Sequence, residues 1–193
     1  MSLKNYSMLT HSLLMYLNEH TNRLVLTSEA ALYFCYHYPK YPSVITLDGY
    51  TTTALEHFKN YCAEHNIDDF KVVENELDFV AFDLKVGSKL TIPFEVNLQN
   101  KNNYNPDLHS MVNGIQTYYI DELTTQILME DLNVKTIREL IYIFKNYEDA
   151  LSPATLDLFR KRLCTRRLKH FKAFLNEEQQ KEFLEVYYHF NLI

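Results

Sequence analysis

The stretch RLVLTSEAALYFCYHYPKYPSVITLDG, residues 23–49, decides which fold the chain can adopt. It opens with the short apolar run Leu24–Leu26, after which Thr27-Ser28 supplies the residue types that start a helix. Two prolines stop that helix, and a β-branched run then closes in Leu47-Asp48-Gly49. The stretch therefore predicts strand, helix and strand in close succession, with a carboxylate presented at the end of the second strand.

Further elements flank this stretch on both sides. Helical spacing covers Tyr6–Glu19 and Thr52–His65, and strand patterns cover residues 70–73, 77–86, 90–98 and 115–120. The arms 77–86 and 90–98 flank Gly87-Ser88 and predict a hairpin, in which Pro93 suggests an edge strand or a bulge. From Asp121 onward the patterns are helical, over residues 122–132, 136–149, 153–175 and 177–190. We expect an α+β protein: a mixed β-sheet with flanking helices over residues 1–119, followed by a C-terminal helical bundle over residues 120–193.

Composition excludes several classes of function. Only three glycines occur, whereas average usage would give roughly a dozen. A Walker A loop and a Rossmann GxGxxG motif are therefore excluded, because both need several glycines for close approach to phosphate. The three cysteines form no CxxC pair and the eight histidines form no HExxH motif, so we expect reduced thiols in a cytoplasmic protein. No apolar run approaches the ~20 residues that span a bilayer, and the N-terminus does not resemble a secretory signal.

Positive charge is concentrated in one segment, although the chain has a net charge of −6. Seven basic residues occur without an acid between positions 160 and 172: Arg160, Lys161, Arg162, Arg166, Arg167, Lys169 and Lys172. An apolar stripe of helical spacing runs through the same segment, so one face packs on the core and the others carry the charge. Two interpretations remain open. In the first, the segment contacts RNA phosphates or an acidic partner protein through Arg160, Arg162, Arg166, Arg167 and Lys169. In the second, it neutralises the acidic remainder of the chain.

Two stretches resemble the AbiEii-type nucleotidyltransferases, toxins of abortive-infection systems on the polymerase-β-like nucleotidyltransferase fold. That family has a strand leading into Gly-Gly or Gly-Ser at a helix start, and a later strand that presents Asp-x-Asp. The matching residues here are Leu26-Thr27-Ser28-Glu29-Ala30-Ala31-Leu32 and Thr46-Leu47-Asp48. The second stretch, residues 112–144, matches through Gly114-Ile115, Asp121-Glu122-Leu123 and Arg138-Glu139-Leu140-Ile141-Tyr142-Ile143. The resemblance covers the order of elements from Arg23 to Leu151.

The resemblance implies transfer of a nucleoside monophosphate from an NTP to an RNA or protein acceptor, in a toxin–antitoxin setting and with Mg²⁺ as cofactor. Asp48 is the carboxylate that remains of Asp-x-Asp. Glu95 on the polar face of the strand 90–98 is the best candidate for a further acid, and Asp83 on the other hairpin arm is the second. We expect Asp48 and Glu95 to be catalytic and to bind Mg²⁺. Ser28 would contact phosphate, and Lys135 and Arg138 would supply positive charge.

Four departures from the family pattern weaken this site. Glycine is missing at the helix start, and Gln126 or Leu128 stands where the family has a lysine. Thr46 stands at the first acidic position, and a hydroxyl is a weak ligand for Mg²⁺. Glu29 lies in the first turn of the helix, where it would repel a polyphosphate.

Each candidate also has a structural alternative. Asp48 could be a turn residue and Ser28 a helix cap, while Glu95, Lys135 and Arg138 could lie on solvated faces. The sequence therefore leaves three functions open. The first is a divergent nucleotidyltransferase, and the second is a non-catalytic module on the same fold that binds RNA or a partner protein through the basic helix. The third is a structural or regulatory partner with no role toward nucleic acid.

Overall fold

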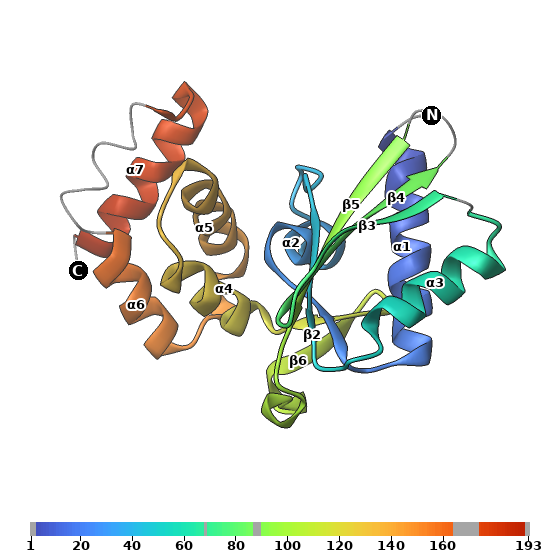
Figure 1. Ribbon diagram of the computed structural model, residues 1–193. Coiled ribbons are helices and arrows are strands. Elements are labelled where there is room, and N and C mark those ends of the chain that lie inside the picture. The colour runs from blue at the N-terminus through green and yellow to red at the C-terminus, as the bar shows by residue number, and fades with distance from the viewer. Residues whose placement is uncertain (1–2, 68, 87–89, 164–173, 192–193) are drawn as a thin grey trace. The chain divides into compact units, whose positions relative to one another are not determined.

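The computed structural model describes residues 3–67, 69–86, 90–163 and 174–191, and the chain divides into two compact units, Met1–Tyr118 and Tyr119–Ile193 (Figure 1). Across its described residues, the N-terminal unit holds a seven-stranded sheet of order β3-β4-β5-β2-β1-β7-β6. Its strands are β1 Leu24–Leu26, β2 Ile45–Gly49, β3 Asp69–Asn75, β4 Phe79–Val86, β5 Leu90–Leu98, β6 His109–Val112 and β7 Ile115–Tyr118. Its helices are α1 Leu3–His20, α2 Ser28–Tyr36 and α3 Ala54–Glu64.

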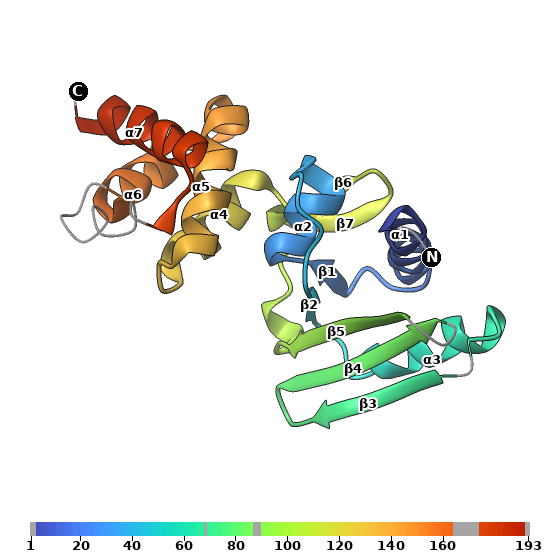
Figure 2. The ribbon, with the colours of Figure 1, turned by 90° about the horizontal axis from the view of Figure 1, so that it is seen from above.

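The sheet is mixed. β3, β4 and β5 form an antiparallel meander, β5 runs parallel to β2, and β2 is antiparallel to β1. β1 in turn runs parallel to β7, which forms an antiparallel pair with β6. Seen from two directions, α1 and α3 lie on one side of the sheet and α2 lies on the other (Figures 1 and 2). Both faces of the central strands are therefore flanked by helices, which explains why the side chains of β1 are buried along its whole length.

Aromatic side chains form the core between α3 and the sheet. The ring of Phe58 lies 4.4 Å from that of Phe82 and 5.5 Å from that of Phe94, measured between centroids. Phe82 and Phe94, directly opposite each other on β4 and β5, stack at 5.2 Å. All three rings are buried. This apolar face fixes the register of β4, β5 and β2, because a slip by one residue would turn these rings toward the opposite face.

The C-terminal unit is helical in its described residues: α4 Ile120–Met129, α5 Val134–Tyr147, α6 Pro153–Leu163 and α7 Glu177–Asn191. Polar side chains cap α6 and α7 as their sequence predicts. Ser152 Oγ accepts from the amide of Thr155 at 3.2 Å, and Asn176 Oδ1 accepts from the amide of Gln179 at 2.8 Å. Phe144 of α5 packs on Phe159 of α6, with 5.5 Å between the ring centroids. These elements confirm the α+β class and the helical C-terminal region.

Three details of the sequence prediction were wrong. The strand β6 was missed, although Asn113-Gly114, with φ angles of 52° and 77°, is the residue pair that favours a tight hairpin turn. β2 does not end before Asp48-Gly49 but continues through both residues, paired with β1 and β5. Pro93 lies in an interior strand without a bulge in its pairing to β4; it is tolerated because the pairing of β5 with β2 begins only at Phe94.

The predicted Gly87-Ser88 turn and most of the second half of the predicted helix 153–175 lie outside the described residues. Among the helices that the structure describes, none is long and apolar enough to cross a membrane.

Candidate functional site

The register between β2 and β5 brings the two predicted carboxylates together. Thr46 pairs with Glu95, and Asp48 pairs with Asn97. Side chains two residues apart on a strand point to the same side, and paired residues of neighbouring strands share that side. Asp48, Glu95, Thr46 and Asn97 therefore form one half-buried polar group on the face of the sheet opposite Phe82 and Phe94.

Two side chains hold the carboxylate of Asp48. Tyr118 Oη donates to Asp48 Oδ2 at 2.5 Å, and Asn97 Nδ2 donates to Asp48 Oδ1 at 3.3 Å. The hydroxyl of Tyr50 lies 2.9 Å from that of Tyr118. Burial raises the pKa of the Tyr118 phenol, and the negative charge of Asp48 raises it further, so this phenol is a hydrogen-bond donor at neutral pH. The turn interpretation of Asp48 is wrong, since Asp48 is a strand residue that faces a polar cluster.

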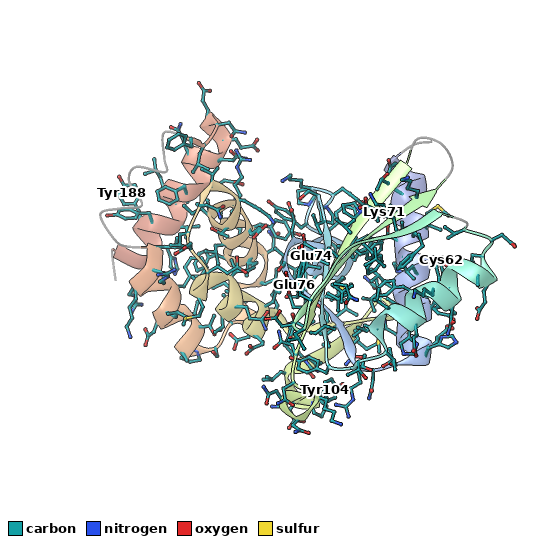
Figure 3. All side chains as sticks on the ribbon, viewed as in Figure 1. Cys62, Lys71, Glu74, Glu76, Tyr104 and Tyr188 are labelled. Atoms are coloured by element: carbon teal, nitrogen blue, oxygen red, sulfur yellow. The ribbon has the colours of Figure 1, made fainter. Side chains whose placement is uncertain are left out.

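An aromatic cluster, formed by Tyr50, Tyr104, His109 and Tyr118, adjoins Asp48 through the Tyr118 hydroxyl. Tyr104, in the loop between β5 and β6 (Figure 3), Tyr50 and Tyr118 surround the ring of His109, at centroid distances of 5.0, 6.0 and 4.8 Å respectively. Neither ring nitrogen of His109 has a hydrogen-bond partner in the described residues. Burial lowers the pKa of His109 despite the opposing effect of Asp48, so the ring is neutral at pH 7.

The aromatic cluster also contacts a positive charge, the guanidinium of Arg23. The guanidinium of Arg23 lies 4.1 Å from the centroid of the Tyr104 ring, and Gln116 Nε2 donates to Tyr104 Oη at 2.8 Å. The position of the Tyr104 ring is thereby fixed by a cation–π contact with Arg23 and by a hydrogen bond from the Gln116 amide.

The junction of β1 and α2 lies beside Thr46, because the amide of Thr27 donates to the carbonyl of Thr46 at 3.0 Å. Ser28 has a φ of 56°, in the left-handed region that glycine adopts without penalty. Thr27, not Ser28, holds the N-cap position, and its side chain makes no capping hydrogen bond. Ser28 is therefore the first residue of α2 with a glycine-like backbone, and its capping interpretation is wrong.

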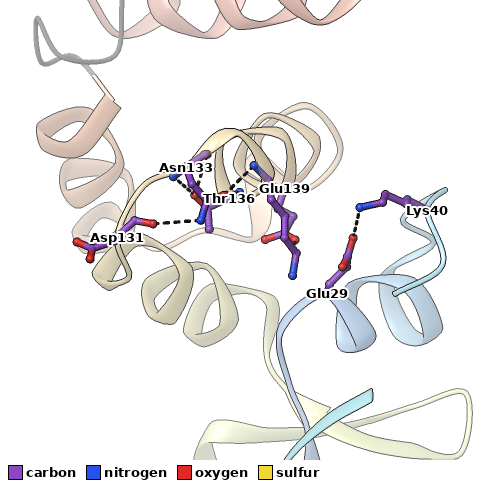
Figure 4. Close-up of polar contacts among 7 residues, drawn as sticks. Glu29, Lys40, Asp131, Asn133, Thr136 and Glu139 are labelled. Carbon is purple, nitrogen blue, oxygen red and sulfur yellow. Dashed lines mark hydrogen bonds and ion pairs between the residues drawn. The ribbon is translucent and has the colours of Figure 1, made fainter. Parts of the chain in front are cut away.

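The carboxylate of Glu29 is held by an ion pair within the same unit. Its side chain is only 3% exposed, and its Oε1 lies 3.1 Å from Lys40 Nζ (Figure 4). This ion pair offsets the charge that the sequence places in the first turn of α2. The repulsion expected between Glu29 and a polyphosphate is correspondingly reduced.

The predicted phosphate-binding cations lie on α5, in the C-terminal unit. Lys135 is exposed and lies 3.8 Å from Glu139 Oε1, and the buried Nε of Arg138 has no hydrogen-bond partner in the described part of the chain. Figure 4 shows the start of α5, where Asn133 Oδ1 accepts from the amides of Lys135 and Thr136 at 2.8 and 3.1 Å. The role of Lys135 and Arg138 toward phosphate stays a prediction.

The described part of the basic segment has partners of its own. Arg160 Nη1 lies 3.4 Å from Asp157 Oδ1, and Arg162 Nη2 donates to the carbonyl of Glu130 at 2.5 Å. Arg162 thus joins α6 to the end of α4. Arg166, Arg167 and Lys169 lie outside the described residues, and contact with RNA or an acidic protein stays a prediction.

The donor set fits one kind of Mg²⁺ site. The described residues contain no group of three or more His, Cys, Asp or Glu side chains that could enclose a metal ion. Mg²⁺, however, is commonly held by one or two carboxylates together with substrate phosphates. Asp48 and Glu95 on neighbouring strands fit that arrangement, and the hydroxyl of Thr46 adds an oxygen without charge.

Part of this site was accessible from the sequence and part was not. Asn97 shares its strand face with Glu95 and could have been included on spacing alone. Tyr118 lies two strands away from Asp48 in the sheet, so no sequence spacing connects them.

No family model and no curated protein matches the chain. Solved structures that match include two crystal structures: JHP933 from Helicobacter pylori, with a TM-score of 0.76, and a “putative nucleotidyltransferase from H. pylori”, with a TM-score of 0.78. Each match covers 100% of this chain at 14% identity, and covers 92% and 95% of the respective structure. Similarity at this identity shows the fold and does not confirm the AbiEii family. The chain therefore has a nucleotidyltransferase-like fold, as its sequence predicted.

Proposed function

We propose that the chain binds a nucleoside triphosphate with Mg²⁺ at Asp48 and Glu95 and transfers the nucleoside monophosphate to a hydroxyl group. The register of β2 and β5 is the observation that carries this proposal, because it sets both carboxylates on one face, beside the start of α2. The resemblance to AbiEii-type toxins suggests an RNA or protein acceptor and a toxin–antitoxin setting.

The residues of the site would act on the metal ion and on the phosphates. Asp48 and Glu95 would hold the Mg²⁺ ion, which when bound neutralises phosphate charge and favours ionisation of the acceptor hydroxyl. The left-handed backbone of Ser28 turns the chain at the start of α2, where amide N–H groups and the Ser28 hydroxyl donate to phosphate oxygens. Lys40 keeps the charge of Glu29 paired during binding.

The chemistry of the transfer needs one group that accepts a proton. The acceptor oxygen forms a bond to the α-phosphorus, the bond from that phosphorus to the β-bridging oxygen breaks, and pyrophosphate leaves. The proton of the acceptor hydroxyl passes to a carboxylate. Asp48 already accepts two hydrogen bonds, whereas Glu95 accepts none from the described residues, so we assign the proton to Glu95.

The proposal is tested by calorimetry and by transfer of labelled nucleotide. The wild-type chain should bind at least one of the four NTPs in a Mg²⁺-dependent manner. Asp48→Asn and Glu95→Gln should each weaken that binding about tenfold or more, because each replaces a proposed carboxylate ligand of Mg²⁺ by a neutral amide. Asp83→Asn is the matched control: Asp83 lies on β4 opposite Pro93, on the same face but farther from β2, and its substitution should leave binding unchanged.

The outcomes separate the first two of the functions that the sequence leaves open, the nucleotidyltransferase and the non-catalytic module. Absence of NTP binding at millimolar Mg²⁺ would refute the proposal. Mg²⁺-dependent binding without labelled product on any RNA or protein acceptor would leave the non-catalytic module. A product that forms equally well in the Asp48→Asn variant would place the chemistry elsewhere in the chain.

A further inference from the structure

We infer that Tyr118 is a positioning residue that orients the Asp48 carboxylate for Mg²⁺, with Tyr50 supporting it. This inference rests on the function proposed above and assigns a residue that neither motif nor fold similarity indicates. Its basis is the chain of short contacts from Asp48 Oδ2 to Tyr118 Oη, at 2.5 Å, and from there to Tyr50 Oη, at 2.9 Å.

The position of Tyr118 in the sheet argues for this role. Tyr118 is the last residue of β7, and Asp48 lies on β2, with β1 between the two strands. The Tyr118 side chain therefore reaches across β1 to Asp48. Val25, the β1 residue that pairs with Asp48, is fully buried and has no polar side chain to offer the carboxylate. Tyr118 and Asn97 are thus the donors that fix the rotation of Asp48 about its side-chain bonds.

Tyr118 is itself held from two directions. Its backbone carbonyl accepts a hydrogen bond from Tyr36 Oη at 2.6 Å, and Tyr36 is the last residue of α2. Its ring lies 4.8 Å from the ring of His109, and its side chain is only 2% exposed. A ring packed in this way has little freedom, so its hydroxyl has a defined place before any ligand arrives.

Fixed donors of this kind matter to a metal ligand. A carboxylate that is oriented in advance loses less side-chain freedom when it binds a cation, and substitution of such a supporting residue typically costs 10–100-fold in metal affinity. Tyr118 can serve only while its hydroxyl keeps its proton. Burial and the charge of Asp48 both act to keep it there, because both raise the pKa of the phenol.

Tyr118→Phe tests the inference, since it keeps the packed ring and removes the donor. The Mg²⁺ concentration that half-saturates NTP binding, measured by calorimetry, should rise about 10–100-fold in this variant. Tyr50→Phe is the matched control, because Tyr50 contacts the Tyr118 hydroxyl and makes no hydrogen bond to Asp48; its effect should be smaller. Weak NTP binding without Mg²⁺ should be equal in all three proteins, which a general loss of structure would not allow.

A second readout needs neither metal nor nucleotide. The hydroxyl proton that Tyr118 donates to Asp48 Oδ2 across 2.5 Å should give a downfield ¹H NMR resonance at neutral pH, and Asp48→Asn should shift it upfield because the charged acceptor is gone. This measurement still decides the matter if Tyr118→Phe fails to fold.

The failures of inference and function are distinguishable. If the wild-type chain binds no NTP with Mg²⁺, the proposed function fails and the inference fails with it. If the wild type binds and Tyr118→Phe has the same Mg²⁺ dependence, the inference alone is overturned. The same conclusion follows if Asp48→Asn leaves the hydroxyl proton resonance of Tyr118 unchanged.

Discussion

Gly49→Ala is the substitution whose effect follows most directly from the packing of β2. A Cβ atom at Gly49 would lie 2.8 Å from Val96 Cγ1, and 3.4 Å from both Leu24 Cδ2 and Leu98 Cδ2. Val96 is 1% exposed, and its branched side chain has little freedom to rotate. The added methyl group therefore meets a neighbour that cannot move aside without disturbing β5.

The expected magnitude is a balance of two effects. Overpacking of a core typically costs about 1–3 kcal/mol. Replacement of glycine reduces the freedom of the unfolded chain, which returns about 0.4–1 kcal/mol. We expect the free energy of unfolding to fall by about 1–2 kcal/mol. Because Gly49 follows Asp48, the shift of β2 should also weaken Mg²⁺-dependent NTP binding.

A double-mutant cycle with Val96→Ala isolates the clash. Val96→Ala alone should cost about 2 kcal/mol, through the loss of two buried methyl groups and the space they leave. In that background the Cγ1 atom is gone, so Gly49→Ala should be neutral or slightly stabilising. Urea unfolding followed by far-UV circular dichroism gives the four free energies. An equal cost of Gly49→Ala in both backgrounds would refute the steric argument.

Two further predictions concern a helix cap and a buried histidine. Asn133→Ala removes the acceptor for two amides of α5 and should lower the free energy of unfolding by about 1 kcal/mol. Asn146→Ala, which loses one exposed bond to the Tyr142 carbonyl, should change it by less than about 0.5 kcal/mol in the same urea experiment. The pKa of His109 is lowered in the folded state by burial. Below about pH 6.5 this imidazole therefore binds a proton in the unfolded chain but not in the folded chain. Stability should therefore fall as pH decreases from 6.5 until the folded-state pKa is reached. His109→Phe should remove this part of the acid dependence in thermal unfolding measured from pH 7.5 to 5; an unchanged dependence would contradict the assignment.

The fold could be predicted because its signals are local. Alternation over residues 90–98 identifies β5, and the same alternation separates Phe94 from Glu95, so the apolar and polar faces of the sheet follow from one strand. Helix starts at Pro153 and Glu177 follow from the capping residues before them. β6 was missed for a different reason: four residues between a polar loop and a tight turn give too short a pattern to distinguish from the loop itself.

The site was predicted less completely because its contacts depend on strand order. Asp48 and Glu95 come together only once β2 is placed beside β5, in parallel and in register. Tyr118 comes within reach only because β7 lies next to β1, an adjacency between strands far apart in the sequence. The chain contains fifteen tyrosines, and no sequence pattern distinguishes Tyr118 from the others.

Ser28 shows which part of a degenerate motif still matters. Its left-handed φ of 56° costs a residue with a side chain about 1–2 kcal/mol, and glycine would avoid that cost. The backbone nevertheless keeps the glycine-like turn, so the geometry is imposed by the junction of β1 and α2, where Thr27 is bonded to Thr46 and the next residues of α2 are buried. Serine at this position therefore lowers stability relative to glycine and does not remove the turn. Glu29 is likewise offset by its pairing with Lys40. The remaining difference from the Asp-x-Asp pattern is the carboxylate that Thr46 does not supply. This difference removes a negative charge from the site and leaves its backbone geometry intact. The proposed active site would depend on how firmly Asp48 and Glu95 hold Mg²⁺, which would make the support of Asp48 by Tyr118 and Asn97 more important than it would be beside a third acid.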